Sequence, residues 1–168
     1  MYSTPLAYFI TFTTYGTWLH GDPRGFVYDQ TTARSDSKGT TTIKGRVGIQ
    51  SSDPVLYRHS QEKLNYPPVF LPSEARDLVD VALRQLAHQR HWHLHELNVR
   101  SNHVHVAVTA GEETPEKVMA DMKAKGTRVL RESGFIEKER KVWTEHGSTL
   151  YLFQEEQFHS ACRYIREQ

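Results

Sequence analysis

The stretch Arg100-Ser-Asn-His-Val-His-Val-Ala-Val-Thr109 decides how this chain folds. Side chains two residues apart on a β-strand point to the same face of the sheet. A strand here therefore places Asn102 and the alternating valines on one face, which is apolar and can pack: Val104, Val106 and Val108. The opposite face carries His103 and His105, followed by Ala107. The pattern predicts a half-buried strand with two imidazoles side by side.

Two histidines at this spacing are typical of a site for one divalent cation. Two neutral imidazoles form an incomplete coordination shell, so a third ligand and a reacting group must come from elsewhere. The final helix, predicted over residues 154–168, offers both. Tyr164 and Gln168 are four residues apart and share one helix face. That face flanks the apolar stripe of the helix, which consists of Phe158, Ala161, Cys162 and Ile165.

His-hydrophobic-His on a strand, followed about sixty residues later by Tyr164-Ile-Arg-Glu-Gln168 on a helix, resembles the single-tyrosine HUH transposases. The opening Tyr8-Phe-Ile-Thr-Phe-Thr-Thr14 is similar to their first strand, and Val99–Val106 is similar to their metal-binding strand. The resemblance covers most of residues 6–19 and 72–168. It implies an α+β fold with an antiparallel sheet and helices packed on it, in a ferredoxin-like or RRM-like topology.

The resemblance also implies the site and the activity. His103, His105 and Gln168 would bind Mg²⁺ or Mn²⁺, and Tyr164 would attack a phosphodiester of single-stranded DNA, commonly folded into a hairpin. Attack by a tyrosine gives a 5′-phosphotyrosine and a free 3′-hydroxyl, which stores the bond energy for rejoining. A bound cation would neutralise the phosphate charge. A homodimer is a further implication, with Tyr164 acting in trans if the last helix packs on the sheet of its partner.

Each of these assignments has an alternative in the sequence. The triplets His91-Trp-His93 and His93-Leu-His95 also match the histidine pattern, although a surface or partner-strand role is favoured for them. Tyr151 is the rival nucleophile, since the turn at His146-Gly-Ser could lie at a cleft. Gln168 closes the printed sequence, where its amide competes with a terminal carboxylate as the metal ligand.

Charge and composition limit the class of protein. The net charge is only +1 and a single cysteine is present, so the chain is neither globally basic nor stapled by an internal disulfide. No apolar run approaches the roughly eighteen residues of a membrane span, and the N-terminus lacks the pattern of a signal peptide. These features favour a cytoplasmic protein, and the transposase resemblance implies association with the nucleoid. Cys162 is predicted to be a core residue.

Basic side chains concentrate in two places that could contact DNA. One is the helix predicted over residues 115–133, which carries Lys117, Lys123, Lys125, Arg128 and Arg131. Arg163 and Arg166 flank Tyr164 and form the other place. Basic side chains beside aromatic ones are typical of single-strand binding, whereas a solvated helix face is the plain alternative for the first group.

The remaining pattern predicts one domain over residues 1–168, with an irregular insertion over residues 20–68. A strand is expected over residues 7–15, a helix over residues 73–89 with Ser73 as its N-cap, and strands over 93–100 and 103–110. Thr114 is the expected N-cap of the helix that ends at Gly134. Thr40–Ile49 could form a short strand or hairpin. Trp143–Phe153 is expected as a connector, with a core strand favoured over a phosphate-binding turn at Gly147-Ser148.

Two other functions are consistent with the same residues. The first is a catalytically silent protein that binds single-stranded or hairpin DNA and does not need Tyr164. The second is a metal-dependent phosphodiester hydrolase that uses water as the nucleophile, with Glu96 or Glu145 as the base.

Overall fold

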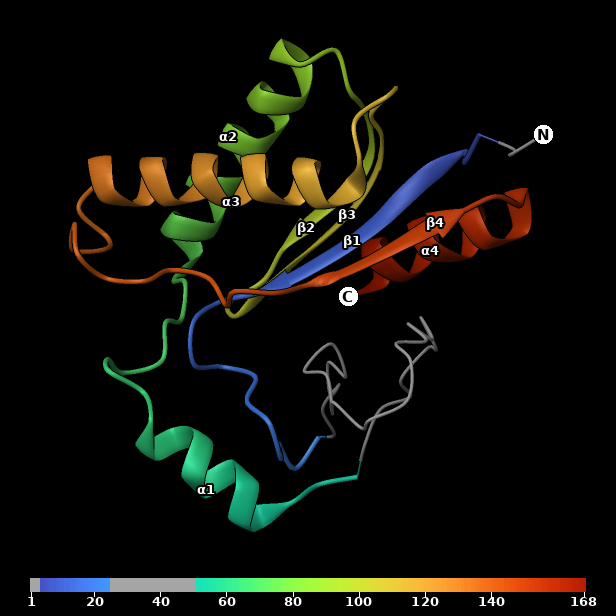
Figure 1. Cartoon of the computed structure of the whole chain (residues 1–168). Coiled ribbons are helices and arrows are strands. Elements are labelled where there is room, and N and C mark those ends of the chain that lie inside the picture. Colours follow the sequence, from blue (N-terminus) through green and yellow to red (C-terminus); the bar gives the residue numbers. More distant parts are fainter. Residues whose placement is uncertain (1–3, 25–50) are drawn as a thin grey trace, which may run out of the picture. The chain divides into compact units, whose positions relative to one another are not determined.

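The computed structural model of the chain describes residues 4–24 and 51–168 (Figure 1). The elements follow the order β1 (Ala7–Thr13), α1 (Pro54–Glu62), α2 (Ser73–Gln89), β2 (His93–Val99), β3 (His103–Thr109), α3 (Pro115–Glu132), β4 (Ser148–Leu152) and α4 (Glu155–Glu167). The chain divides into two compact units. One contains residues 68–168 and the N-terminal strand through Thr17, and the other lies within Trp18–Pro67.

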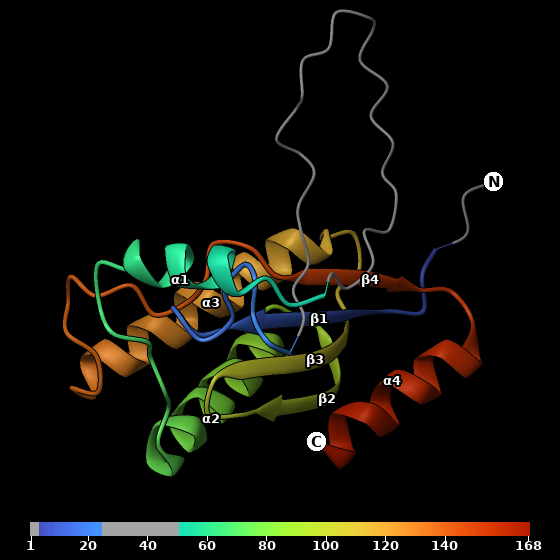
Figure 2. The same ribbon diagram turned by 90° about the horizontal axis from the view of Figure 1, so that it is seen from below.

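The larger unit is a four-stranded antiparallel sheet with the strand order β2-β3-β1-β4. Helices α2 and α3 cover one face of this sheet and α4 covers the other, as Figures 1 and 2 show. Adjacent strands β2 and β3 form a hairpin closed by the bond from the Arg100 amide to the His103 carbonyl, 2.8 Å. The expected α+β fold with an antiparallel sheet is confirmed.

The valine face of β3 lies at the centre of the core. Val104, Val106 and Val108 are fully buried against α2 and α3, together with Ile10 and Phe12 of β1. This confirms the alternation predicted for the strand. Each buried side chain of this size favours the folded state by about 1.5–3 kcal/mol, so the histidine strand is held in place from its apolar side.

Strand β2 departs from simple alternation. Leu94 and Leu97 both pack into the same core, although they are three residues apart. A β-bulge between Leu94 and Glu96 accounts for this, because the extra residue shifts the register relative to β3. The sequence pattern, read with a strict period of two, places these leucines on opposite faces and is wrong at this point.

The helix boundaries follow the sequence signals, with one exception. Thr114 caps α3 by accepting a bond from the Lys117 amide at 3.3 Å, and Gly134 follows the helix with a φ of 76°. Both features confirm the prediction. Ser73, by contrast, is the first residue of α2, and its hydroxyl donates to Glu74. The cap position belongs to Pro72, which has no side-chain bond to offer, so the predicted Ser73 cap is wrong.

The segment before α4 contains a strand. Trp143 is buried, with its indole N–H donating to the Lys123 carbonyl at 3.0 Å and its ring edge-on to Phe12. Strand β4 then begins at Ser148 and pairs with β1 at the edge of the sheet. Gly147 fits where no side chain could, because an added Cβ would lie 2.6 Å from the Thr11 carbonyl oxygen. The strand interpretation of this connector is the one that the structure supports.

The second unit is not wholly irregular. Helix α1 begins after Asp53, whose carboxylate accepts from the amides of Val55 and Leu56. Gly21, at a φ of 84°, approaches the Asp53 carbonyl so closely that a Cβ would lie 2.3 Å from it. The expectation of an irregular insertion over residues 20–68 is therefore wrong for residues 54–62, because a short polar helix gives little periodic signal. The possible strand at Thr40–Ile49 lies outside the described residues.

Candidate tyrosine and histidine site

His103 and His105 stand on the face of β3 that α4 covers. Their neighbours on β1 are Thr13 and Thr11, and the two imidazole rings have centroids 4.6 Å apart. His105 is buried, with 6% of its surface exposed, whereas His103 is half-buried. The strand thus presents the pair as predicted, with one imidazole in the protein and the other nearer to solvent.

Hydrogen bonds fix the orientation of both rings. His103 Nδ1 lies 2.7 Å from Asn102 Oδ1, and because an amide oxygen only accepts, Nδ1 carries the proton when the ring is neutral. His105 Nδ1 lies 2.7 Å from the Thr11 hydroxyl, which can accept in the same way. The lone pair then resides on Nε2 of each ring. Histidine ligands to metals are oriented in this manner, so the pair fits a divalent cation.

Burial also keeps His105 in the form that binds metal. It lowers the pKa of His105 to about 4, and the charges of His103 and Arg100 add to the effect. The imidazole is therefore neutral at physiological pH, and no proton competes with a cation for its lone pair.

Helix α4 is fastened across the sheet at the end where the histidines lie. Ala161, Cys162 and Ile165 form its buried stripe, and Phe158 packs beside them, as predicted. The Asn98 amide donates to the Ile165 carbonyl at 2.8 Å, and the Arg100 guanidinium donates to the Gln168 carbonyl. Carbonyls in the last turn of a helix have no partner within the helix, so these bonds anchor the C-terminal end of α4.

Tyr164 lies next to the histidine pair. Its ring centroid is 5.4 Å from that of His105 and 6.0 Å from that of Phe9, which lies between α4 and the sheet. The side chain is 47% exposed, so a ligand can reach the phenol. Tyr164 and His105 are 59 positions apart in sequence, and the packing of α4 on the sheet brings them together.

The rival tyrosine stands on the other face of the sheet. Tyr151 pairs with Tyr8 across β4 and β1, and the rings of the two residues meet edge-on with centroids 5.2 Å apart. Tyr8 belongs to the core under α2 and α3, which is the face opposite to His103 and His105. Tyr151 therefore shares no face with the histidine pair.

The position of Gln168 gives less support to its predicted role as the third metal ligand than the position of Tyr164 gives to the predicted role of nucleophile. Gln168 is exposed, and its backbone carbonyl accepts a hydrogen bond from the Arg100 guanidinium. Within residues 4–24 and 51–168, no group of three or more His, Cys, Asp or Glu side chains could hold a metal ion. An amide such as that of Gln168 is outside those residue types.

The earlier histidines lie at the far end of the same sheet face. His93 and His95 have ring centroids 4.4 Å apart, and His95 bonds to the Thr109 hydroxyl at 2.8 Å and packs against Phe158. His93 and His91 are exposed, and His91 occupies a turn with a φ of 56°. They are surface and partner-strand residues, whereas the ring of Tyr164 lies beside that of His105.

The basic residues divide between the two faces of the sheet. Arg163 and Arg166 are on α4 with Tyr164, although Arg166 forms an ion pair with Glu96. Lys117, Lys123 and Arg128 are on α3, which covers the other face. Lys117 pairs with Asp121 at 2.5 Å, and the Lys123 ammonium donates to three backbone carbonyls: those of Thr144, Glu145 and His146. Lys123 thus holds the segment before β4 in place.

Three polar residues that support the site were missed in the sequence: Thr11, Asn98 and Asn102. Thr11 and Asn98 stand opposite His105 on the two neighbouring strands. A polar residue at an inward-facing strand position could have indicated a site. The strand-pairing register was needed to show that Thr11 and Asn98 lie opposite His105. Of the two carboxylates considered as hydrolytic bases, Glu96 forms an ion pair with Arg166.

The fold and site define a class of protein: an antiparallel α+β domain with a histidine pair on an inner strand and a tyrosine-bearing helix packed across it. The chain matches the family described as "Transposase IS200 like" over residues 65–168. Since this is more than half of its length, the chain belongs to the IS200-like transposase family.

Solved structures have the same fold. A candidate transposase from Deinococcus radiodurans is 16% identical, with a TM-score of 0.52 over 99% of this chain and 93% of that one. A REP-associated tyrosine transposase bound to a REP hairpin is 9% identical, with a TM-score of 0.50 over 98% of this chain and 67% of that one. No curated protein matches the chain. None of the described helices is long and apolar enough to cross a membrane.

Proposed function

We propose that this transposase-family protein cleaves and rejoins single-stranded DNA through a covalent bond to Tyr164. The observation that carries the proposal is the position of the Tyr164 ring, exposed and 5.4 Å from the His105 ring. A nucleophile and a phosphate-activating group must both reach one phosphorus atom, which requires this kind of proximity. The IS200-like family assignment supports a reaction on DNA.

In the proposed step, the phenolic oxygen of Tyr164 attacks the phosphorus of the scissile phosphodiester. The new O–P bond attaches the 5′-phosphate of the downstream DNA segment to tyrosine, the bond from phosphorus to the 3′ oxygen of the upstream segment breaks, and the phenolic proton leaves as that 3′ oxygen gains one. Attack by a 3′-hydroxyl on the phosphotyrosine reverses the step and rejoins the strand.

His103 and His105 would hold Mg²⁺ or Mn²⁺ through Nε2, and Gln168 is proposed as a further ligand. A cation bound there would neutralise charge on the phosphate oxygens. Thr11 and Asn102 orient the two imidazoles toward that role. Burial of His105 keeps its lone pair available.

The proposed substrate is a strand that carries a hairpin. The REP-associated transposase with the same fold was solved with a REP hairpin bound, which supports this choice. Arg163 is exposed one residue before Tyr164 and could contact the phosphate backbone near the cleavage point.

The test is a search for the covalent intermediate on a denaturing gel. The protein is incubated with Mn²⁺ and a pool of hairpin DNAs that carry single-stranded extensions, beside Tyr164→Phe and His103→Ala. Tyr151→Phe is the matched control, because it removes an equally exposed phenol from the other sheet face. We expect a protein–DNA band for the wild type and Tyr151→Phe, and a loss of at least about a hundredfold in the other two variants.

Each other result would replace the proposal with a definite alternative. A band that survives Tyr164→Phe and disappears in Tyr151→Phe would transfer the nucleophile to Tyr151. Tight binding without any band would indicate a silent hairpin-binding protein. Cleaved DNA without a covalent species would indicate a hydrolase.

A further inference from the structure

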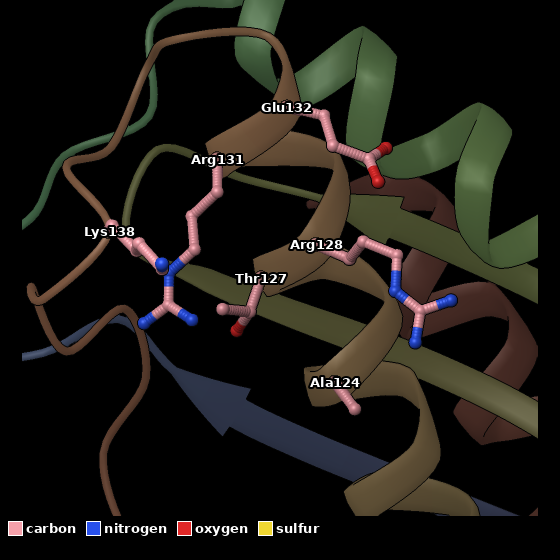
Figure 3. Close-up of a pocket in the computed structure, with 6 residues that line it drawn as sticks. All are labelled: Ala124, Thr127, Arg128, Arg131, Glu132 and Lys138. Carbon is pink, nitrogen blue, oxygen red and sulfur yellow. The ribbon is translucent and has the colours of Figure 1, made fainter.

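A solvent-facing cavity of about 640 Å³ lies beside the C-terminal half of α3, on the sheet face that does not carry Tyr164 (Figure 3). Its lining comes from one stripe of the helix and from the connector before β4: Ala124, Thr127, Arg128, Arg131, Glu132 and Lys138. The stripe is separate from the buried stripe of α3, which includes Met122, Gly126 and Leu130. Its side chains are therefore not needed for the core.

Three cations line this cavity without a carboxylate partner. Within the described part of the chain, Arg128, Arg131 and Lys138 form no ion pair, whereas Arg84, Arg90 and Lys117 each pair with an aspartate. Figure 3 shows Arg131 and Lys138 on the same side of the pocket and the Glu132 carboxylate directed away from both. Positive charges that line one cavity without a paired carboxylate create a potential that favours a bound anion.

The cavity is also held in shape. The Arg131 guanidinium donates to the Arg140 carbonyl at 3.2 Å, which ties the end of α3 to the connector that carries Lys138. The same connector is fixed further on by Trp143, which packs against Gly126 of α3. A guanidinium that is already oriented loses less rotational freedom when it binds a phosphate.

We propose that Arg128, Arg131 and Lys138 form a second DNA contact, which binds backbone phosphates outside the cleavage site. The identity of the ligand rests on the proposed function, since a DNA transferase must hold the strand beyond the phosphate that it cuts. Contacts to phosphates are independent of base sequence and position the nucleic acid rather than read it. The site is on the opposite sheet face from Tyr164, so it holds DNA without taking part in the reaction.

The experiment measures DNA affinity in a cleavage-inactive background. Fluorescence anisotropy with a labelled hairpin that carries a single-stranded extension is recorded for Tyr164→Phe alone and combined with Arg128→Gln/Arg131→Gln. The matched control is Arg84→Gln/Arg90→Gln, which removes the same charge from two exposed arginines that pair with aspartates. Lys138→Gln tests the connector separately. Melting temperatures check that all variants fold.

We expect Arg128→Gln/Arg131→Gln to weaken binding roughly tenfold at about 0.1 M salt, and Lys138→Gln roughly threefold. The slope of log affinity against log salt should fall in magnitude by about 1.4–1.8 for the double variant, as for two lost phosphate contacts. The control should change neither quantity appreciably. With Tyr164 restored, the double variant should still form the covalent band at saturating DNA.

Equal effects of the two double variants would overturn the inference and leave the proposed function intact, provided that the covalent band persists. If the Tyr164→Phe protein binds no hairpin DNA of the pool at any salt concentration, both the inference and the proposed function fail.

Discussion

His105 is buried and keeps a hydrogen-bond partner, so the same side chain can pack against the sheet and take part in the proposed site. The side chain is 6% exposed and bonds to Thr11, while Ala107 beyond it is wholly buried. A larger neighbour than Ala107 would hold α4 away from the strand. His103 is half-buried and oriented by Asn102, its neighbour in sequence. The pair is thus built from one residue inside the protein and one at its surface.

The lowered pKa of His105 predicts a pH dependence of stability in the metal-free protein. The unfolded chain binds a proton near pH 6.5 and the folded chain only near about 4, so stability is complete above about pH 6.5 and falls as pH drops toward 4. Between about pH 7 and pH 4.5 this histidine should account for a loss of roughly 2 kcal/mol.

The measurement is urea unfolding with EDTA at both pH values, for the wild type and His105→Asn. The wild type should lose about 2 kcal/mol more than the variant over this interval. Parallel losses in the two proteins would show that His105 is not the group responsible.

Hydrogen bonds at the C-terminal end of helix α4 fix the position of the helix along the sheet. Its buried stripe determines which side faces the sheet, whereas Asn98 and Arg100 bind carbonyls near its C-terminus. Those bonds set where Tyr164 stands along the strand. The ion pair between Arg166 and Glu96 joins the same surfaces but is largely solvated, so it should contribute little to the anchoring of the helix.

Asn98→Ala should therefore slow the formation of the covalent Tyr164–DNA band more than Glu96→Gln does. Loss of the bond to the Ile165 carbonyl costs about 1 kcal/mol, which corresponds to about a fivefold slower formation of the covalent band. Amide hydrogen exchange should accelerate in the last turn of α4 but not in α2. Glu96→Gln should change the rate less than about twofold. A larger effect from Glu96→Gln would assign the anchoring role to the ion pair.

At the scale of the whole molecule, the sheet separates two surfaces. The face under α4 contains the histidine pair and Tyr164, and the face under α2 and α3 contains the core. Since α4 lies on its own sheet, one chain supplies every residue of the proposed site. An antiparallel sheet with helices on both faces allows this, because the strand that carries the histidines is central and reaches both layers.

This arrangement predicts that inactive variants will not complement each other. His103→Ala and Tyr164→Phe, mixed in equal amounts with hairpin DNA and Mn²⁺, should give no covalent band, because neither chain has both groups. Mixing after joint unfolding and refolding should give the same result. A restored band would show that α4 exchanges between two copies of the chain and that Tyr164 acts in trans.

Local patterns in the sequence determined the elements and the faces of the central strand. Alternation at Val104, Val106 and Val108 predicted a core face and a histidine face, and Thr114 and Gly134 marked the ends of α3. These signals act over a few residues, since side-chain direction follows from the backbone period. They failed where the period was interrupted, at the bulge in β2, and where an element was short and polar, in α1.

Only the tertiary structure decided what meets the histidine pair. Residue spacing favoured Tyr164 over Tyr151 but left Tyr151 as a rival, whereas strand pairing places Tyr151 on the opposite face. Nor could it show that Lys123 is bound to backbone carbonyls, or that Thr11 and Asn98 flank His105. The Lys123–Thr144 and Thr11–His105 contacts join residues 21 and 94 positions apart, and they depend on which surfaces pack together rather than on any local period.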